Sequence, residues 1–268
     1  MTARLRSVPA LLVALVVAGG SGYGALTTGF DAGATASIPF AGPSAEHLLG
    51  TDKLGRDVLD RLLVGGTGLL LIALTLAAAV TVLGAVLGAL AALRPAVDTA
   101  LRLATDGAVL IPAILAMLVL GAALPHAGVA AIGVTGVVLG TPYAAKVLQP
   151  AAAVVAMSGH VEAAEGTGET VPRLILCEIL PSMRRTVTAV FGLRMVEATY
   201  LVATAAFLHV PTGLDDTNWA QSVRDNGAGL LLNPWAALAP ALMIAATSIA
   251  VTLATRRPGT VDPAGVAA

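Results

Sequence analysis

Long apolar stretches separated by shorter polar connections run along nearly the whole chain. A helix needs about 20 mainly apolar residues to cross roughly 30 Å of hydrocarbon. Six stretches reach or approach this length, at about residues 8–28, 67–93, 104–124, 128–146, 187–209 and 235–254. The second is the clearest, because residues 67–93 contain no charged side chain. The pattern predicts an all-α polytopic membrane protein with six transmembrane helices.

The composition supports this class and argues against others. Of the 268 residues, 57% are hydrophobic and 12% are charged, a balance outside that of ordinary soluble domains. A net charge of -1 and an aromatic content of 3% do not match the basic, aromatic-rich surface of a nucleic-acid-binding protein, so no nucleic acid partner is expected. The four histidines lie too far apart in the sequence to predict a metal site.

The first apolar stretch allows a second interpretation. It follows Arg4 and Arg6, and its strongest apolar run, residues 8–18, has the length of a signal-peptide core. Apolar character resumes at residues 24–30, and no clear small-residue cleavage site follows. A transmembrane helix is therefore favoured over a cleaved signal peptide.

Basic residues in the connections predict the orientation, because Lys and Arg are retained on the cytoplasmic side of a membrane. With the N-terminus inside, the inner set holds Arg4, Arg6, Arg94, Arg102, Lys146, Arg173, Arg184, Arg185, Arg194, Arg256 and Arg257. The outer set holds only Lys53, Arg56, Arg61 and Arg224. This asymmetry predicts an N-in, C-in topology.

The spans and this orientation divide the chain into four parts. Residues 1–28 form an N-terminal tail and the first transmembrane helix, and residues 29–66 form an external loop. Residues 67–255 form a five-helix core that includes a cytoplasmic loop at 147–186, and residues 256–268 form a cytoplasmic tail. Only the two long loops leave room for a role beyond connecting helices.

The external loop predicts an amphipathic helix from Thr51 to Leu63, with Thr51 as its N-cap and Gly65-Gly66 as its stop. Three apolar residues recur on one face at four-residue spacing: Leu54, Val58 and Leu62. Two ion pairs are expected on the other face: Arg56 with Asp60, and Asp57 with Arg61. By this pattern alone the segment is an interfacial helix that leads into the second span.

The cytoplasmic loop predicts a helix over residues 161–169. Glu162, Glu165 and Glu169 share one face of this helix. Val161, Ala164 and Gly168 lie on a neighbouring face, which therefore carries no large side chain. Such a helix fits into a groove of a partner, although a solvated connecting helix would have the same pattern. Pro172 suits the first turn of a second helix at residues 173–180, which Pro181 ends or kinks.

Both loops resemble motifs of one transporter family. Six residues resemble the cytoplasmic "EAA" loop of ABC importer permeases: Glu162, Ala163, Ala164, Gly168, Leu180 and Pro181. The segment from His47 to Leu59 resembles the external HPLGTDxLGRDVL signature of the dipeptide/oligopeptide/nickel subfamily, in the second of its two permease chains. The matching signature residues include Gly50, Thr51, Asp52, Leu54, Gly55, Arg56 and Asp57, whereas Leu48 stands where that subfamily usually has proline.

This resemblance implies the transmembrane domain of a type I ABC importer in a bacterial inner membrane. The chain would form half of the translocation pathway for di- or oligopeptides, and its EAA loop would be the coupling helix that docks on an ATPase. The implied partners are a second homologous permease chain, two ATP-binding domains and an external solute-binding protein. Because the chain contains no GxxxxGK[ST] phosphate loop, ATP and Mg would be bound by the partners, and no cofactor or enzymatic activity is expected here.

Charged and aromatic residues near the spans complete the expectations. Arg194 and Glu197 are expected to pair and are candidates for lining the pathway, since charge inside a membrane often marks one. Asp106 is expected to pair with Arg102. Trp219 and Trp235 are expected to anchor the outer membrane edge.

Other functions stay open from the sequence. Nickel, haem or a glutathione-like solute are alternative cargoes within the same family. A secondary transporter without an ATPase and a non-transporting membrane scaffold are alternatives from other classes. A secondary transporter would be expected to carry several polar groups at mid-membrane or paired broken helices, and the sequence offers little of either.

Overall fold

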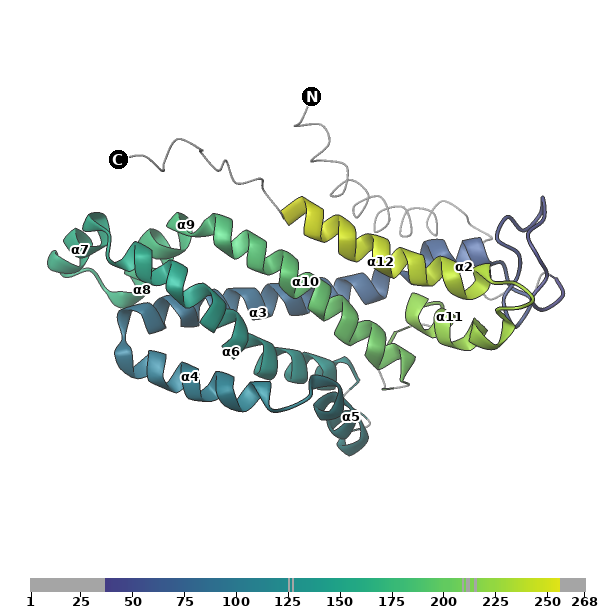
Figure 1. Cartoon of the computed structure of the whole chain (residues 1–268), viewed down its shortest axis with the longest axis horizontal. Helices are drawn as coiled ribbons and strands as arrows, with labels where there is room; N and C mark the ends of the chain where they lie inside the picture. Colours follow the sequence, from purple (N-terminus) through teal and green to yellow (C-terminus); the bar gives the residue numbers. More distant parts are fainter. Residues whose placement is uncertain are drawn as a thin grey trace, which may run out of the picture.

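The computed structural model describes residues 37–124, 126, 128–208, 210, 213–214 and 216–255. The predicted first span at 8–28 and the tail at 256–268 lie outside these residues. Within the described part the chain is helical and has no strand; it forms an elongated bundle of long helices (Figure 1). The elements are α2 (Val58–Gly65), α3 (Thr67–Leu93), α4 (Pro95–Val109), α5 (Ala113–Ala123), α6 (Val129–Ala156), α7 (Gly159–Gly166), α8 (Val171–Arg173), the π-helix η1 (Leu174–Ile179), α9 (Leu180–Ser182), α10 (Arg184–Phe207), α11 (Trp219–Asn226), the 3-10 helix η2 (Gly227–Gly229) and α12 (Trp235–Thr255).

Four continuous helical segments in the described part are long and apolar enough to cross a membrane. They are Val58–Leu93, which joins α2 to α3, Val129–Ala156, Arg184–Phe207 and Trp235–Thr255. These segments confirm the predicted second, fourth, fifth and sixth spans as apolar helices. The predicted fourth span stopped at residue 146, whereas α6 continues to Ala156 and carries Pro142 and Pro150 inside it.

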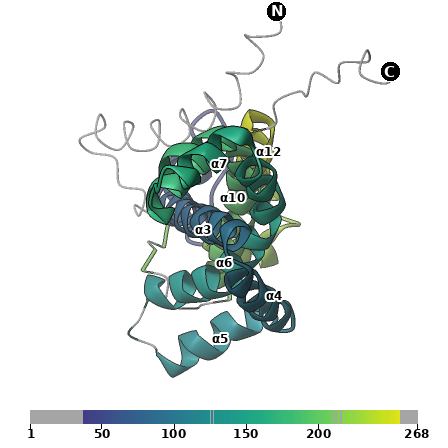
Figure 2. The same ribbon diagram turned by 90° about the vertical axis from the view of Figure 1, so that its left-hand side faces the viewer.

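The prediction of a continuous third span at 104–124 is wrong. The chain forms α4 and α5 instead, and the two helices are bent by 80° where they meet. Pro112 explains the break, because a proline disfavours helical geometry in the preceding residue and has no N–H to donate. If this bent pair counts as one span, the described residues hold five. Figure 2 shows α5 on the side of the bundle away from α12.

Small residues allow α3 and α6 to pack closely along their length. A Cβ added to Gly84 would lie 2.6 Å from Cβ of Ala144, and one added to Gly88 would lie 2.8 Å from the Ala145 carbonyl oxygen. On the facing helix, a Cβ on Gly136 would lie 2.7 Å from Leu76. The two helix backbones can therefore approach closely, as helices in lipid do where their side chains are small.

Two hydrophobic clusters place the two long loops at opposite ends of the bundle. The central cluster joins α3, α6 and α10 to Trp219 of α11. The second joins the C-terminal halves of α3 and α6 to Val161 of α7 and Ile179 of η1. We call the two ends the α7 end and the α11 end, and Figure 1 shows them at the left and right of the molecule.

Two ion pairs near α4 differ from the prediction. Arg102 pairs with Asp98, at 2.9 Å, and not with Asp106. Asp106 instead lies 3.4 Å from Lys146 of α6. Asp98 and Asp106 both lie one turn away from Arg102 on the same helix, so the sequence spacing alone could not decide which of them pairs with it.

Candidate functional site

Three places in the described residues carry the predicted functional side chains: α7 and its flanks, the loop before α2, and a cavity beside α10. The first two lie at opposite ends of the molecule, and the third lies between them (Figure 1). Together they contain every residue that the sequence assigns to a site.

At the α7 end, α7 is anchored on one side and open on the other. The Val161 side chain is fully buried in the second cluster, and Ala164 packs partly against it. Glu162, Ala163 and Glu165 are exposed. The acidic face expected from the sequence is therefore presented outward while the opposite face holds the helix to the bundle.

Gly168 ends this helix. Its φ of +86° lies in the left-handed region that favours glycine. The Gly168 N–H donates to the Glu165 carbonyl at 3.0 Å, and the Glu169 N–H donates to the Ala164 carbonyl at 3.2 Å. This pair of bonds is the Schellman arrangement, which satisfies carbonyls that a helix end would leave open. The glycine of the EAA-like loop is thus explained by backbone geometry.

The second half of the EAA-like loop is one helical run with a widened middle. Pro172 lies in the first turn of α8, as predicted, and the π-helix η1 follows. Leu180 packs partly against the second cluster and Pro181 is exposed. Because Pro181 cannot donate a helical hydrogen bond, the wider π geometry before it accommodates the proline without a break.

At the α11 end, the prediction of a helix from Thr51 to Leu63 is wrong. The helix begins only at Val58, and its N-cap is Asp57, whose Oδ1 accepts from the backbone N–H groups of Leu59 and Asp60. Gly50 and Gly55 have φ of 71° and 74°, so the segment before Asp57 is a folded loop. Thr51, predicted as the N-cap, pairs with Asp57 in an isolated antiparallel bridge.

The ion pairs predicted along that helix also do not form as expected, because Asp52 takes both arginines. Its Oδ2 lies 2.9 Å from Nε of Arg56 and 3.5 Å from Nε of Arg61. Its Oδ1 accepts from the backbone N–H groups of Leu54 and Arg56. Asp52, Arg56 and Arg61 are all buried. Asp57 instead pairs with His47, at 2.7 Å.

This loop is fastened to the segment around α11. Lys53 Nζ lies 2.9 Å from Asp225, and the Lys53 backbone N–H donates to the Asn226 side chain. The Asn233 amide, fully buried, donates to the carbonyls of Leu49 and Thr51 at 3.0 Å each. We call this set of contacts the external clasp, after the external loop that the sequence predicts; its members are His47, Thr51, Asp52, Lys53, Arg56, Asp57, Arg61, Asp216, Trp219, Asp225, Asn226 and Asn233.

Electrostatics reinforce the clasp at Asp225. Partial burial raises the pKa of this carboxyl, but hydrogen bonds and charge from Lys53 and Arg224 outweigh that effect and hold the pKa below its usual value of 3.8. Arg56 adds a contact of 3.2 Å to Asp216, and Arg61 donates to the Asp216 backbone carbonyl. The signature charges therefore serve contacts between segments about 160 to 170 residues apart.

Trp219 is not the membrane-edge anchor that the sequence suggested. Its side chain is 1% exposed, it packs over Gly66 between α2 and α3, and its Nε1 donates to the Leu62 carbonyl at 2.7 Å. Trp235 keeps 41% exposure, as an anchor would. Asn226, Asn233 and Asp216 were missed from the sequence, because single polar residues in a connection give no periodic signal.

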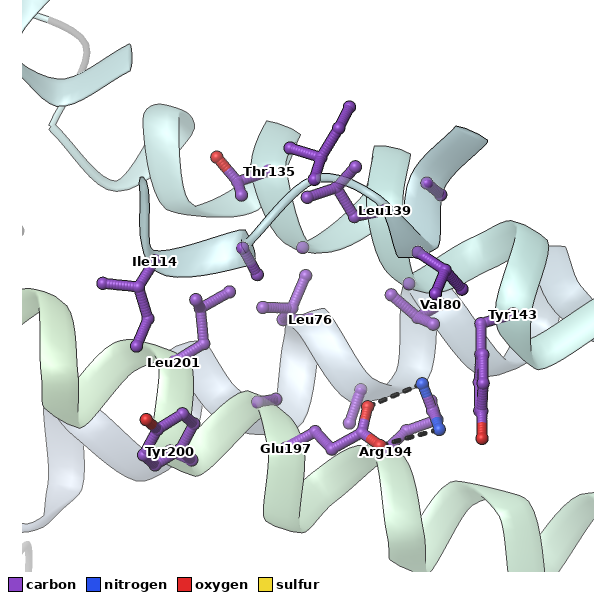
Figure 3. A pocket seen from close by; sticks show the side chains of 18 residues that line it. Leu76, Val80, Ile114, Thr135, Leu139, Tyr143, Arg194, Glu197, Tyr200 and Leu201 are labelled. Carbon is purple, nitrogen blue, oxygen red and sulfur yellow. Dashed lines mark hydrogen bonds and ion pairs between the residues drawn. The ribbon is translucent and has the colours of Figure 1, made fainter. Parts of the chain in front are cut away.

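The third place is a cavity of about 350 Å³ between α3, α4, α5, α6 and α10 (Figure 3). Arg194 and Glu197 line it and form the predicted ion pair, with Nη1 2.6 Å from Oε2 and Nη2 2.8 Å from Oε1. The Arg194 guanidinium lies 5.0 Å from the centre of the Tyr143 ring, a cation–π contact. Among the described residues, no group of histidine, cysteine or acidic side chains could hold a metal ion.

Comparison with known proteins gives a consistent family. Over 229 residues the chain is 30% identical to a protein of Brucella suis biovar 1 named as a peptide transport system permease protein, covering 85% of this chain and 77% of the relative. It is 28% identical to a D,D-dipeptide transport system permease protein of Escherichia coli (strain K12), covering 72% and 64% of the two chains. A glutathione transport system permease protein of Escherichia coli O6:K15:H31 is 26% identical, over 79% and 70%.

The family model of binding-protein-dependent transport system inner membrane components matches residues 81–257. This range begins inside α3, contains α7 and the cavity-lining helix α10, and covers most of the chain. With its several apolar helices, the chain is a multi-pass membrane protein and a transport permease component. It belongs to the family of inner-membrane components of binding-protein-dependent transport systems.

Proposed function

We propose that this chain forms half of the translocation pathway of an ATP-driven importer of short peptides, and that α7 is its coupling helix. The observation that carries the proposal is the two-sided construction of α7. Val161 fixes the helix to the ends of α3 and α6, while Glu162, Ala163 and Glu165 stay exposed for a partner. A push on the exposed face would be transmitted to the two long helices through packed side chains.

The coupling role is assigned to the six residues of the EAA-like loop, each with its own part. Glu162 and Ala163 would contact the ATPase, and Ala164 and Leu180 would join that contact to the second cluster. Gly168 sets the end of α7, and Pro181 sets the turn into α10. The residues of the loop before α2, including Gly50, Leu54 and Gly55, are proposed to keep the outer end of the permease tightly packed through the external clasp.

The proposed assembly contains a second homologous permease chain, two ATP-binding domains that hold ATP and Mg, and an external solute-binding protein. The proposed topology has six transmembrane helices with both termini in the cytoplasm of a bacterium. It would place the α7 end inside, the α11 end outside, and the tail at 256–268 inside. The bent pair α4–α5 would count as one of the six.

The peptide cargo is supported by the relatives, two of which carry peptide or dipeptide transport in their names. A glutathione permease among the relatives favours a modified peptide such as glutathione as the second candidate. Uptake of labelled dipeptide, tripeptide and glutathione into proteoliposomes that contain the whole complex separates the two. Uptake that needs ATP supports the importer, and uptake that proceeds without ATP contradicts it.

Bulk on the exposed face of α7 tests the coupling role. We expect Ala163→Trp to keep assembly in the membrane and to lose most ATP-driven uptake, because the side chain points away from the bundle. Ala163→Ser adds only one polar atom at the same position and should keep uptake near that of the unmodified complex. Full uptake with Ala163→Trp would exclude α7 as the coupling helix.

The orientation is tested by labelling with a membrane-impermeant maleimide. Leu231, fully exposed between α11 and α12, would be labelled as Leu231→Cys in intact spheroplasts after Cys177 is replaced by alanine. The native exposed Cys177, near the α7 end, would be labelled only after the membrane is opened. The reverse pattern would invert the proposed topology.

A further inference from the structure

The cavity beside α10 has one charged corner in a mostly apolar lining. Leucine, valine, isoleucine, alanine and glycine residues make up most of its wall. The polar exceptions are Thr135, Tyr143, Arg194, Glu197 and Tyr200. Figure 3 shows Arg194 beside Glu197, with the Tyr143 ring next to the guanidinium. A small cavity with few polar groups in one corner is the usual form of a site that orients a small ligand.

Arg194 is committed to the protein and is poorly placed to receive a solute. Its side chain is only 4% exposed, both terminal nitrogens bond to Glu197, and Tyr143 covers the guanidinium. Its Nε is buried and has no hydrogen-bond partner in the described residues. A solute carboxylate would therefore have to displace Glu197 from an arrangement in which two hydrogen bonds fix the pair.

Glu197 has the opposite character. Its side chain is 51% exposed and lines the cavity. Each carboxylate oxygen accepts one bond from Arg194, and an ionised carboxylate offers about four acceptor sites in all. Glu197 therefore keeps acceptor capacity toward the open space, and Arg194 holds the carboxylate in a fixed orientation.

We infer that the cavity is a subsite for the primary ammonium group of a small solute, with Glu197 as the group that receives it. The apolar remainder of the wall would contact the short apolar body of the same solute. An accessible acceptor beside a buried cation selects a donor, and the ammonium has three donors and no acceptor. This inference rests on the proposed function, in that the solute crosses the membrane beside α10.

The volume agrees with a small solute. A cavity of about 350 Å³ is at the lower end of the range for ligand sites, roughly 300 to 1,000 Å³. The free amino terminus of a dipeptide and a simple alkylammonium present the same chemistry to Glu197, so protection experiments must separate them.

The test measures charge selectivity at a cysteine placed in the cavity wall. The whole transporter, with its ATPase, its partner permease and its binding protein, would carry Cys177→Ala and Leu139→Cys. Leu139 lines the cavity and lies away from the ion pair (Figure 3). The rates of modification by aminoethyl methanethiosulfonate, an ammonium, and by sulfonatoethyl methanethiosulfonate, an anion, give a cation-to-anion ratio. Ile114→Cys is a second reporter in case the first disturbs packing.

Glu197→Gln is expected to lower this ratio about tenfold, because a unit charge on the wall of a poorly solvated cavity acts strongly on the ions that enter it. Asp106→Asn is the matched control, since it removes the same charge from a side chain that lines a neighbouring hollow and not this cavity. The control should change the ratio less than about twofold. An unchanged ratio in Glu197→Gln, an equal fall in Asp106→Asn, or two reporters that neither reagent modifies would overturn the inference.

Protection identifies the source of the ammonium. Alanyl-alanine should slow modification of the reporter, and N-acetyl-alanyl-alanine should not. Slowing by ethylamine as well would assign the subsite to primary amines in general, and equal slowing by the acetylated peptide would overturn it. ATP-driven uptake is measured on the same preparation, so that a transporter which imports but shows no charge selectivity refutes only the subsite, and one that never imports refutes the proposed function.

Discussion

Trp219 and Leu62 are joined by a 2.7 Å hydrogen bond from the indole Nε1 to the backbone carbonyl, at the point where α2 passes into α3. The bond ties the segment after α10 to the beginning of the longest apolar segment, Val58–Leu93. The indole ring also lies against Gly66, where any Cβ would overlap it. The junction between α2 and α3 is therefore held by one aromatic side chain that comes from a third helix, α11.

Gly66→Ala is expected to destabilise the assembled protein by about 1 to 3 kcal/mol, because the added methyl displaces a buried ring from a close-packed site. The measurement is the thermal unfolding midpoint in detergent or nanodiscs. Gly107→Ala is the control: a Cβ there meets nothing within 4 Å, and alanine is the better helix former. A Gly66→Ala protein that is as stable as Gly107→Ala would show that the ring does not fix this junction.

Asp52 carries the next prediction. It is the shared partner of Arg56 and Arg61, and all three side chains are buried. Removing one partner from a buried ionic group leaves uncompensated charge, so Asp52→Asn is expected to cost about 3 to 5 kcal/mol of unfolding free energy. Asp98→Asn, which breaks the mostly exposed pair with Arg102, should cost no more than about 1 kcal/mol.

The measurement is again the unfolding midpoint, with the amount of protein reaching the membrane as a second readout. Equal effects of Asp52→Asn and Asp98→Asn would mean that the external clasp adds little to stability. A much larger effect at Asp52 would explain why the signature of this loop carries the charges of Asp52 and Arg56 although both side chains are buried.

The external clasp also marks where sequence reasoning fails. The residues of the signature were identified from the sequence, but their partners were assigned by helical spacing in a segment that is a folded loop. Spacing of four predicts neighbours only if the segment is helical, and two glycines with positive φ keep residues 50–56 out of a helix. The observed partners lie at least 155 residues further along the chain, in the segment between α10 and α12, where no local sequence pattern predicts the contacts. They are Asp216, Asn226 and Asn233.

The apolar spans were predictable for a simpler reason. Residues 67–93 carry no charge, and a helix is the only open-chain structure whose backbone is satisfied within a bilayer. The Arg194–Glu197 pair was also found from spacing, because both residues do lie in one helix. The 80° bend before Ala113 was not, since Pro112 could equally have produced a mild kink in a continuous span.

A pH dependence follows from Asp225. The Lys53 and Arg224 contacts lower the pKa of this carboxyl in the folded protein below its usual 3.8. The ionised carboxylate is therefore more stable in the folded than in the unfolded chain. Its contribution to stability is present at pH above about 4 and is lost as the pH falls through the folded pKa. Asp225→Asn should therefore lower the unfolding midpoint slightly at pH 7.

The difference between this variant and the unmodified protein should be smaller at about pH 3 than at pH 7, because the carboxyl takes up a proton as the pH falls, first in the unfolded chain and then in the folded one. Because Lys53 and Asp225 are partly exposed, the difference at neutral pH should stay within about 1 kcal/mol. Unfolding curves at the two pH values check the sign. A difference that grows toward low pH would contradict the assignment.

Two glycines two residues apart give the last prediction. Gly166 and Gly168 both lie at the exposed end of α7, and a Cβ at either meets nothing within 4 Å. Only Gly168 has positive φ, so Gly168→Ala strains the backbone by about 1 kcal/mol, whereas Gly166→Ala favours the helix. If α7 couples ATP hydrolysis to uptake, Gly168→Ala should lower uptake per ATP hydrolysed severalfold, and Gly166→Ala should not.

The ratio of uptake to hydrolysis, measured in proteoliposomes, separates this effect from simple loss of protein. The added methyl is the same in both variants and neither position has a neighbour to clash with, so a drop in Gly168→Ala alone comes from the backbone conformation that ends α7. Equal ratios in the two variants would mean that the left-handed end of the helix is not needed for coupling. A drop in Gly166→Ala alone would instead point to contact of that residue with the ATPase, because alanine favours the helix and no described residue lies within 4 Å of a methyl at position 166.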